Sequence, residues 1–96
     1  MANSGGAGPT PGGSQNKYGV TATTLLRSGQ SVLFRVSVTV AGSAAGAAYD
    51  SNSTSSLNNQ IGAIPSAVGV YEFIWPCSTG IVVVPPTGGT ISVSYE

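Results

Sequence analysis

The stretch Ser31–Val40, "SVLFRVSVTV", contains the pattern that decides the fold. Apolar and polar side chains alternate along it, and a period of two is typical of a β-strand. Strict alternation places one set of side chains on one face (Val32, Phe34, Val36, Val38, Val40) and a second set on the other (Leu33, Arg35, Ser37, Thr39). We therefore expect a strand whose valine-rich face is opposite the face that carries Arg35.

On both sides of this strand the chain shows short β-type runs, separated by turn signals, and no helical periodicity. The turn residues Arg27–Gln30 predict a hairpin between the runs beside them, and Pro85–Gly89 predict a second hairpin at the end of the chain. Counted together, the runs predict about seven strands, at residues 18–26, 31–40, 47–51, 60–65, 69–76, 81–84 and 90–96. Strands at this spacing predict an all-β fold, a small antiparallel β-sandwich or barrel.

Residues 1–17, "MANSGGAGPTPGGSQNK", have a different texture, with five glycines, two prolines and no apolar side chain larger than alanine after Met1. Such a segment buries too little surface to offset the entropy lost on ordering. We therefore predict a flexible N-terminal arm over 1–17 and one sandwich domain over 18–96. If the arm binds a partner, its candidate contact residues are Asn3, Pro9, Pro11, Gln15, Asn16 and Lys17.

Charge is scarce: 6% of the residues are charged, the net charge is zero at pH 7, and there is no histidine. Binding to nucleic acid or to a membrane surface needs clustered lysine and arginine, so the sequence predicts neither partner. The opening residues have neither a basic start nor an apolar stretch, and they predict no secretion signal. A surface near zero net charge favours association, which indicates a protein that sits in an assembly.

The residues that catalysis needs are missing, so the sequence predicts no enzyme. Without histidine a hydrolase triad is excluded, and the interior acids Asp50 and Glu72 are expected to be solvated. Residues 50–54, "DSNST", begin like a calcium loop, but Ser55 and Ile61 stand where that loop needs Gly and Glu. We expect an Asx-type turn there, and no metal or cofactor. The single cysteine, Cys77, is expected to be a small buried filler.

Two groups of residues suggest a subunit interface. Tyr71, Phe73 and Trp75 alternate along 69–76 and predict core, an interface, or a stacking platform for sugars. Arg35 either pairs with Glu72, within or between subunits, or is simply exposed on its strand.

The end of the chain points the same way, because its final strand has no lysine or proline to protect an edge unless a neighbouring subunit covers it. We therefore expect a homo-oligomer, with a trimer favoured. Its interface candidates are Arg35, Glu72, Tyr71, Trp75 and Tyr95.

The second half of the chain resembles a set of small bacteriophage and prophage proteins. The resemblance rests on Tyr49-Asp50, the segment Ile61–Tyr71, the segment Pro76–Pro85 and the final Val93–Tyr95. It implies a virion component without catalytic residues, in particular a decoration (cement) protein. Such a protein is made in the host cytoplasm, binds the outer surface of the major capsid protein shell and stabilises the head. The alternatives are a structural protein of the tail, collar or fibre, or a receptor- or carbohydrate-binding module.

Overall fold

The computed structural model describes residues 15–96, and these form eight β-strands without a helix. The predicted antiparallel β-sandwich is confirmed, with eight strands in place of about seven. The strands are β1 (Gln15–Val20), β2 (Thr24–Ser28), β3 (Ser31–Val40), β4 (Gly46–Tyr49), β5 (Gln60–Ile64), β6 (Gly69–Cys77), β7 (Gly80–Val84) and β8 (Thr90–Tyr95).

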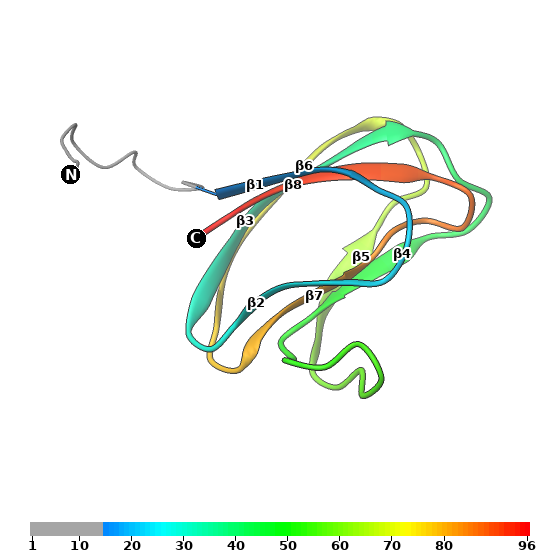
Figure 1. Ribbon diagram of the computed structural model, residues 1–96. Coiled ribbons are helices and arrows are strands. Elements are labelled where there is room, and N and C mark those ends of the chain that lie inside the picture. The colour runs from blue at the N-terminus through cyan, green and yellow to red at the C-terminus, as the bar shows by residue number, and fades with distance from the viewer. Residues whose placement is uncertain (1–14) are drawn as a thin grey trace, which may run out of the picture.

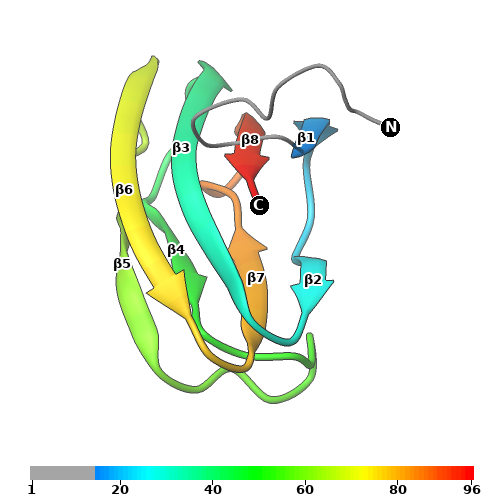
Figure 2. The same ribbon diagram turned by 90° about the vertical axis from the view of Figure 1, so that its left-hand side faces the viewer.

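The strands form two antiparallel layers of four, seen edge-on in Figure 1 and face-on in Figure 2, where β6, β3, β8 and β1 lie side by side. Sheet A has the order β1-β8-β3-β6, and sheet B has the order β2-β7-β4-β5. Within sheet A, β1 pairs with β8 and β3 with β6; within sheet B, β2 pairs with β7 and β4 with β5. The chain thus resembles one long hairpin, with its tip between β4 and β5, rolled into a sandwich. This is the connectivity of a jelly roll.

Both hairpins predicted from local turn signals are wrong. The turn Arg27–Gln30 joins β2 in sheet B to β3 in sheet A, and Pro85–Gly89 join β7 in sheet B to β8 in sheet A. The run expected as a single strand over 18–26 is likewise divided between β1 and β2, which belong to different sheets. A turn signal shows where the chain bends, whereas the choice of sheet depends on partners that are distant in sequence.

A β-bulge changes the facing of β3. Leu33 pairs with Tyr95 and Arg35 pairs with Ser94, so β3 holds one more residue than β8 at this level. Leu33 therefore faces the core together with Val36, and both are fully buried. The expectation that Leu33 shares a face with Arg35 is wrong, because strict alternation ends at the bulge.

The core lies between the sheets and is built from aliphatic side chains of both. Its buried cluster comprises Val20, Leu33, Val36, Val38, Ala48, Ile64, Cys77, Ile81, Val83, Ile91 and Val93. Cys77 is part of it, as expected for a small apolar filler. Half-buried side chains, including Tyr71, Phe73 and Tyr95, close its margins.

The last strand is not an edge of its sheet. β8 lies inside sheet A, hydrogen-bonded to β1 on one side and to β3 on the other. The argument that a neighbouring subunit must cover this strand therefore fails. The edges of the described sheets are β1 and β6 in sheet A and β2 and β5 in sheet B.

Candidate functional site

The residues chosen for the N-terminal arm fall into two groups. Asn3, Pro9 and Pro11 lie outside the described residues. Gln15, Asn16 and Lys17 belong to β1, where they pair with Tyr95, Ser94 and Val93. Assigning these three to the arm was wrong, since the backbone of β1 forms a strand ladder with β8 and residues 15–17 therefore belong to the sandwich.

Arg35 and Glu72 form an ion pair within the chain, which is one of the arrangements predicted for them. They are register partners on β3 and β6, and the Nε of Arg35 lies 3.2 Å from Oε2 of Glu72. Both side chains are more than half exposed, at 53% and 59%. A pair in this setting contributes about 0–1 kcal/mol to stability. It leaves the outer face of sheet A without net charge at this point.

The three aromatic side chains of β6 do not form one exposed platform. Tyr71 and Phe73 pack against the core, and the Tyr71 hydroxyl donates a hydrogen bond to the Ala67 carbonyl at 2.8 Å. Phe73 also covers Gly62 of β5, so that its ring helps to close the gap between the sheets. Trp75 is 47% exposed. Sugar stacking along this row is therefore not supported.

The outer face of sheet A is the first candidate binding surface. Its side chains come from all four strands: Asn16, Tyr18, Ser92, Ser94, Arg35, Ser37, Val70 and Glu72. Serines from β8 and β3 form the floor of a shallow groove of about 190 Å³, while Tyr18 and Val70 stand at its two rims. The rim side chains are 74% and 65% exposed. Small side chains at the centre and large ones at the margins make this face concave.

The interface candidates from the sequence lie only in part on this surface. Arg35 and Glu72 are on it, whereas Tyr71 and Tyr95 are half-buried against the core. The sequence does not identify Tyr18 as a surface residue, because the strand expected over 18–26 gives no indication of which of its faces is solvent-exposed. The apolar surface continues along the edge strand, where Val70 and Ile74 are also exposed.

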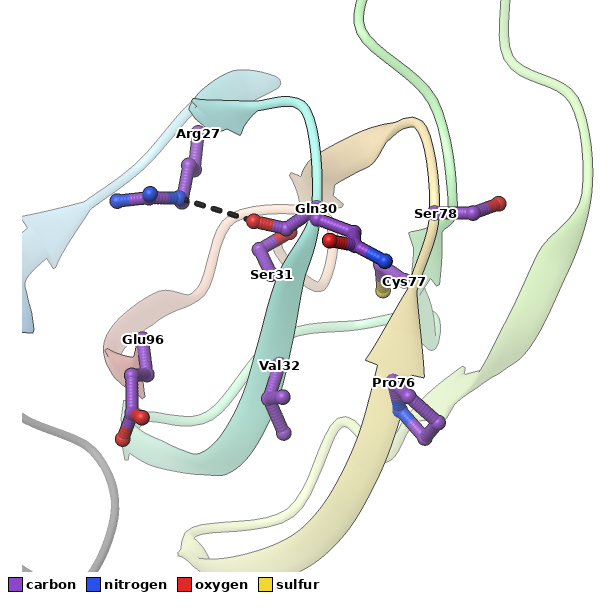
Figure 3. A pocket seen from close by; sticks show the side chains of 8 residues that line it. All are labelled: Arg27, Gln30, Ser31, Val32, Pro76, Cys77, Ser78 and Glu96. Atoms are coloured by element: carbon purple, nitrogen blue, oxygen red, sulfur yellow. Dashed lines mark hydrogen bonds between the residues drawn. The ribbon is translucent and has the colours of Figure 1, made fainter.

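A second candidate site is a pocket of about 500 Å³ at one end of the sandwich, shown in Figure 3. It lies where the β2–β3 turn, the end of β6 and the end of β8 meet. Its charged and polar lining is Arg27, Gln30, Ser31, Ser78 and Glu96, and its less polar lining is Val32, Pro76 and Cys77. None of the predictions from the sequence placed a site here, because the lining comes from three segments that are far apart in the chain, 27–32, 76–78 and 96.

Cys77 is chemically quiet in this pocket. Burial is the main cause that raises the pKa of its thiol to about 11, and the negative charge of Asp50 adds to the effect. The thiol also donates to the Trp75 carbonyl at 3.7 Å. Since the thiolate is the reactive form, this cysteine is unsuited to nucleophilic chemistry at neutral pH.

Asp50 has a structural role that the sequence patterns did not reveal. One carboxylate oxygen accepts hydrogen bonds from the backbone N–H groups of Thr79 and Gly80, at 2.8 and 3.2 Å. The other accepts from the N–H and hydroxyl of Ser78, at 3.1 and 3.3 Å. Burial acts to raise the pKa of this carboxyl, but these hydrogen bonds outweigh it and lower the pKa below its ordinary value. Asp50 therefore holds the β6–β7 turn.

No group of three or more potential metal-ligating side chains occurs within residues 15–96. The same part of the chain contains no helix that is long and apolar enough to cross a membrane. Comparison of the chain with protein-family models, curated proteins and solved structures found no match.

Proposed function

We propose that the protein is a bacteriophage capsid decoration protein, which binds the outer surface of the major capsid protein shell and stabilises the head. The observation that carries the proposal is the outer face of sheet A. This face is concave, rich in hydroxyl groups, and neutral through the Arg35–Glu72 pair, with Tyr18 and Val70 exposed at its rims. Exposed aromatic and aliphatic groups around a neutral polar centre suit a protein–protein contact.

The connectivity of the sandwich supports the same proposal by analogy. Jelly rolls occur in viral capsid and lectin domains, among other proteins. This is an analogy of fold and not of site, so it favours a class of function without identifying residues. The resemblance of residues 49–95 to phage virion components points in the same direction.

A homo-oligomer, with a trimer favoured, remains part of the proposal on different grounds from the final strand. The edge strand β6 has no lysine, and Glu72 is its only charged residue. Val70, Ile74 and Trp75 are exposed along it. The first part of this edge, residues 69–72, precedes the bulge and Pro76 and is therefore prone to pairing with another chain. Light scattering of the purified protein would measure the number of subunits.

The location on the virion is tested by counting copies. Quantitative mass spectrometry of purified particles should find this protein in near-stoichiometric amounts relative to the major capsid protein. A few copies per particle would instead favour a tail, collar or fibre protein, or a receptor-binding module. Absence from the particles would contradict a virion role altogether.

The contact surface is tested by binding to undecorated capsids. The double substitution Tyr18→Ser and Val70→Ser should weaken binding at least about tenfold, because both rims of the groove lose their apolar contacts. Leu57→Ser is the matched control, since Leu57 is an exposed apolar residue in the β4–β5 loop, away from sheet A. Equal binding of both variants would remove the outer face of sheet A from the proposal.

The N-terminal arm is tested by a truncation that ends at residue 14, because a cut at residue 16 would remove part of β1. The shortened protein should keep its fold and bind undecorated capsids more weakly than the full chain. Capsid affinity equal to that of the full chain would assign attachment to the sandwich alone.

A further inference from the structure

The six charged side chains of the protein are few enough to account for one by one. Asp50 holds the β6–β7 turn, and Arg35 and Glu72 neutralise each other. Of the remaining three, Arg27 and Glu96 line the pocket at the end of the sandwich. The structure describes no ion pair between them, although Figure 3 shows both on the same side of that pocket. In a chain so poor in charge, this placement calls for an explanation.

Hydrogen bonds hold both charged residues in place. The Nε of Arg27 donates a hydrogen bond to the Gln30 carbonyl at 3.2 Å, which leaves the two terminal nitrogens of the guanidinium for another acceptor. The backbone of Glu96 exchanges two hydrogen bonds with Val32, each 2.9 Å long, which hold the residue against β3. The Arg27 guanidinium is therefore held by a hydrogen bond of its own, and the Glu96 carboxylate is positioned through its backbone.

The floor between these groups and β6 is apolar. Val32 and Pro76 are register partners on β3 and β6, and Figure 3 shows their side chains pointing the same way. Gln30 and Ser78 add an amide and a hydroxyl at the margin. A volume of about 500 Å³, with apolar side chains and a few polar groups in its lining, is in the range of small-molecule sites.

The opposite charges of Arg27 and Glu96 limit the kinds of ligand that the pocket can bind. A small anion is attracted by Arg27 and repelled by Glu96, and a small cation has the opposite difficulty. A hydroxyl group is compatible with both, because it accepts from a guanidinium and donates to a carboxylate. Val32 and Pro76 offer an apolar contact for the C–H face of a sugar ring. We propose that this pocket binds a neutral saccharide of one or two rings.

This site is separate from the aromatic row of β6 and does not depend on attachment to a capsid. Trp75, the single tryptophan, precedes Pro76 directly and is 47% exposed. Its fluorescence therefore helps to distinguish the two sites, because the ring belongs to the aromatic row and is outside the pocket lining.

The test is a titration of the full ¹⁵N-labelled chain with maltose, lactose and N-acetylglucosamine, followed by amide chemical shifts and by Trp75 fluorescence. Glycylglycine serves as a zwitterionic probe. We expect at least one saccharide to bind with a dissociation constant of about 1–10 mM, typical of a small open site. The shifted amides should be those of Arg27, Gln30, Val32 and Ser78.

Three substitutions test the assigned roles. Arg27→Gln and Glu96→Ala should each weaken saccharide binding about tenfold, because each removes a charged hydrogen-bonding group. Glu96→Gln should keep binding within about threefold, since its amide oxygen still accepts from a hydroxyl. Lys17→Gln, a change of charge on β1, is the control and should leave binding unchanged. Melting curves of each variant establish that it is folded, and Glu96→Ala tests the site even if Arg27→Gln does not fold.

Four results would overturn the proposal. These are the absence of any saccharide-dependent shift, shifts confined to the outer face of sheet A, and saccharide binding unaffected by both Arg27→Gln and Glu96→Ala. The fourth is stronger binding of glycylglycine than of any sugar, abolished by Glu96→Gln, which would assign the pocket to a zwitterion.

Discussion

At the scale of single residues, Asp50 illustrates how one carboxylate can organise a turn that is distant in sequence. The carboxylate accepts four hydrogen bonds, all from residues 78–80 at the β6–β7 turn. Gly80 is confined there as well, because a Cβ atom would lie 2.6 Å from the carbonyl oxygens of Arg27 and Ser51. The loop after β4 and the turn after β6 are thus packed together at one end of the sandwich.

Replacing Asp50 by alanine should destabilise the protein by about 1–2 kcal/mol, because several backbone N–H groups lose a charged acceptor that is partly screened by solvent. Urea denaturation at pH 7 measures the loss. Glu72→Gln is the control, and it should cost less than about 1 kcal/mol because it breaks only an exposed ion pair. An equal loss for the two variants would contradict the role given to Asp50.

The lowered pKa of Asp50 predicts a pH dependence. The stabilisation is complete above the ordinary pKa of 3.8 and is lost as the pH falls through the lower value of the folded protein. Denaturation of the parent protein should therefore become easier on acidification below about pH 4, and Asp50→Asn should show a flatter profile. Parallel profiles for the two proteins would show that other carboxyl groups cause the acid sensitivity.

At Ile74 the backbone conformation matters more than the contacts of the side chain. It has a φ of 48°, a conformation that is costly for a β-branched residue, and its side chain is 56% exposed. Ile74→Gly should therefore leave stability unchanged or raise it by up to about 1 kcal/mol. Val70→Gly, at an exposed position on the same strand without this strain, should lower stability by about 1 kcal/mol. Thermal melting of both variants makes the comparison, and a larger loss at Ile74 would contradict it.

At the scale of secondary-structure elements, the bulge that crosses sheet A determines which side chains reach the core. One residue separates Leu33 from Arg35 on β3. Their partners on β8 are adjacent in sequence, whereas two residues separate their partners on β6. The extra residues accumulate from β8 to β6 and increase the local twist. Ile74 lies in the longest of these steps, which accounts for its unusual backbone.

β1 is the element whose loss should have the clearest effect. Removing residues 1–20 deletes a strand, exposes one edge of β8 and removes the buried Val20, so we expect a loss of at least about 2 kcal/mol. Removing residues 1–14 leaves all eight strands of residues 15–96 in place and should change stability by less than about 0.5 kcal/mol. Denaturation of both truncated proteins tests this, and similar stabilities would mean that β1 is dispensable.

At the scale of the whole molecule, the jelly roll brings together strands from opposite ends of the described chain. β1 closes onto β8, and among the strand pairs of residues 15–96 only β4–β5 joins strands that are consecutive in sequence. Pairing of this non-local kind makes folding slow and cooperative. The core should therefore open as a unit and not strand by strand.

Cys77 provides the test of this cooperativity. Its thiol is 2% exposed and has a pKa raised to about 11, chiefly by burial. Alkylation by iodoacetamide at pH 8 should be at least about 100-fold slower in the native protein than in urea. Its native rate should also increase in step with destabilising substitutions such as Asp50→Ala. Rapid native labelling would show that the end pocket opens locally.

The strands themselves could be predicted from the sequence, because alternation and turn residues are local properties. The terminal run Thr90–Tyr95 shows this directly, since Ile91 and Val93 alternate with serine and are buried as that pattern indicates. The absence of helical periodicity was equally informative about the fold class. Of the candidate site, the sequence indicated only that Arg35 either pairs with Glu72 or is exposed on its strand, and the structure shows an exposed pair.

The tertiary structure alone decided which sheet each strand joins, which face of β3 is buried, and which residues line the end pocket. Both turns expected to make hairpins carry the chain between sheets, and the last strand lies in the interior of sheet A. The pocket lining comes from residues 27–32, 76–78 and 96, and these three segments meet only because the roll brings them to one end. The physical reason is that alternation and turns depend on neighbouring residues, whereas sheet membership and sites depend on burial shared between distant strands.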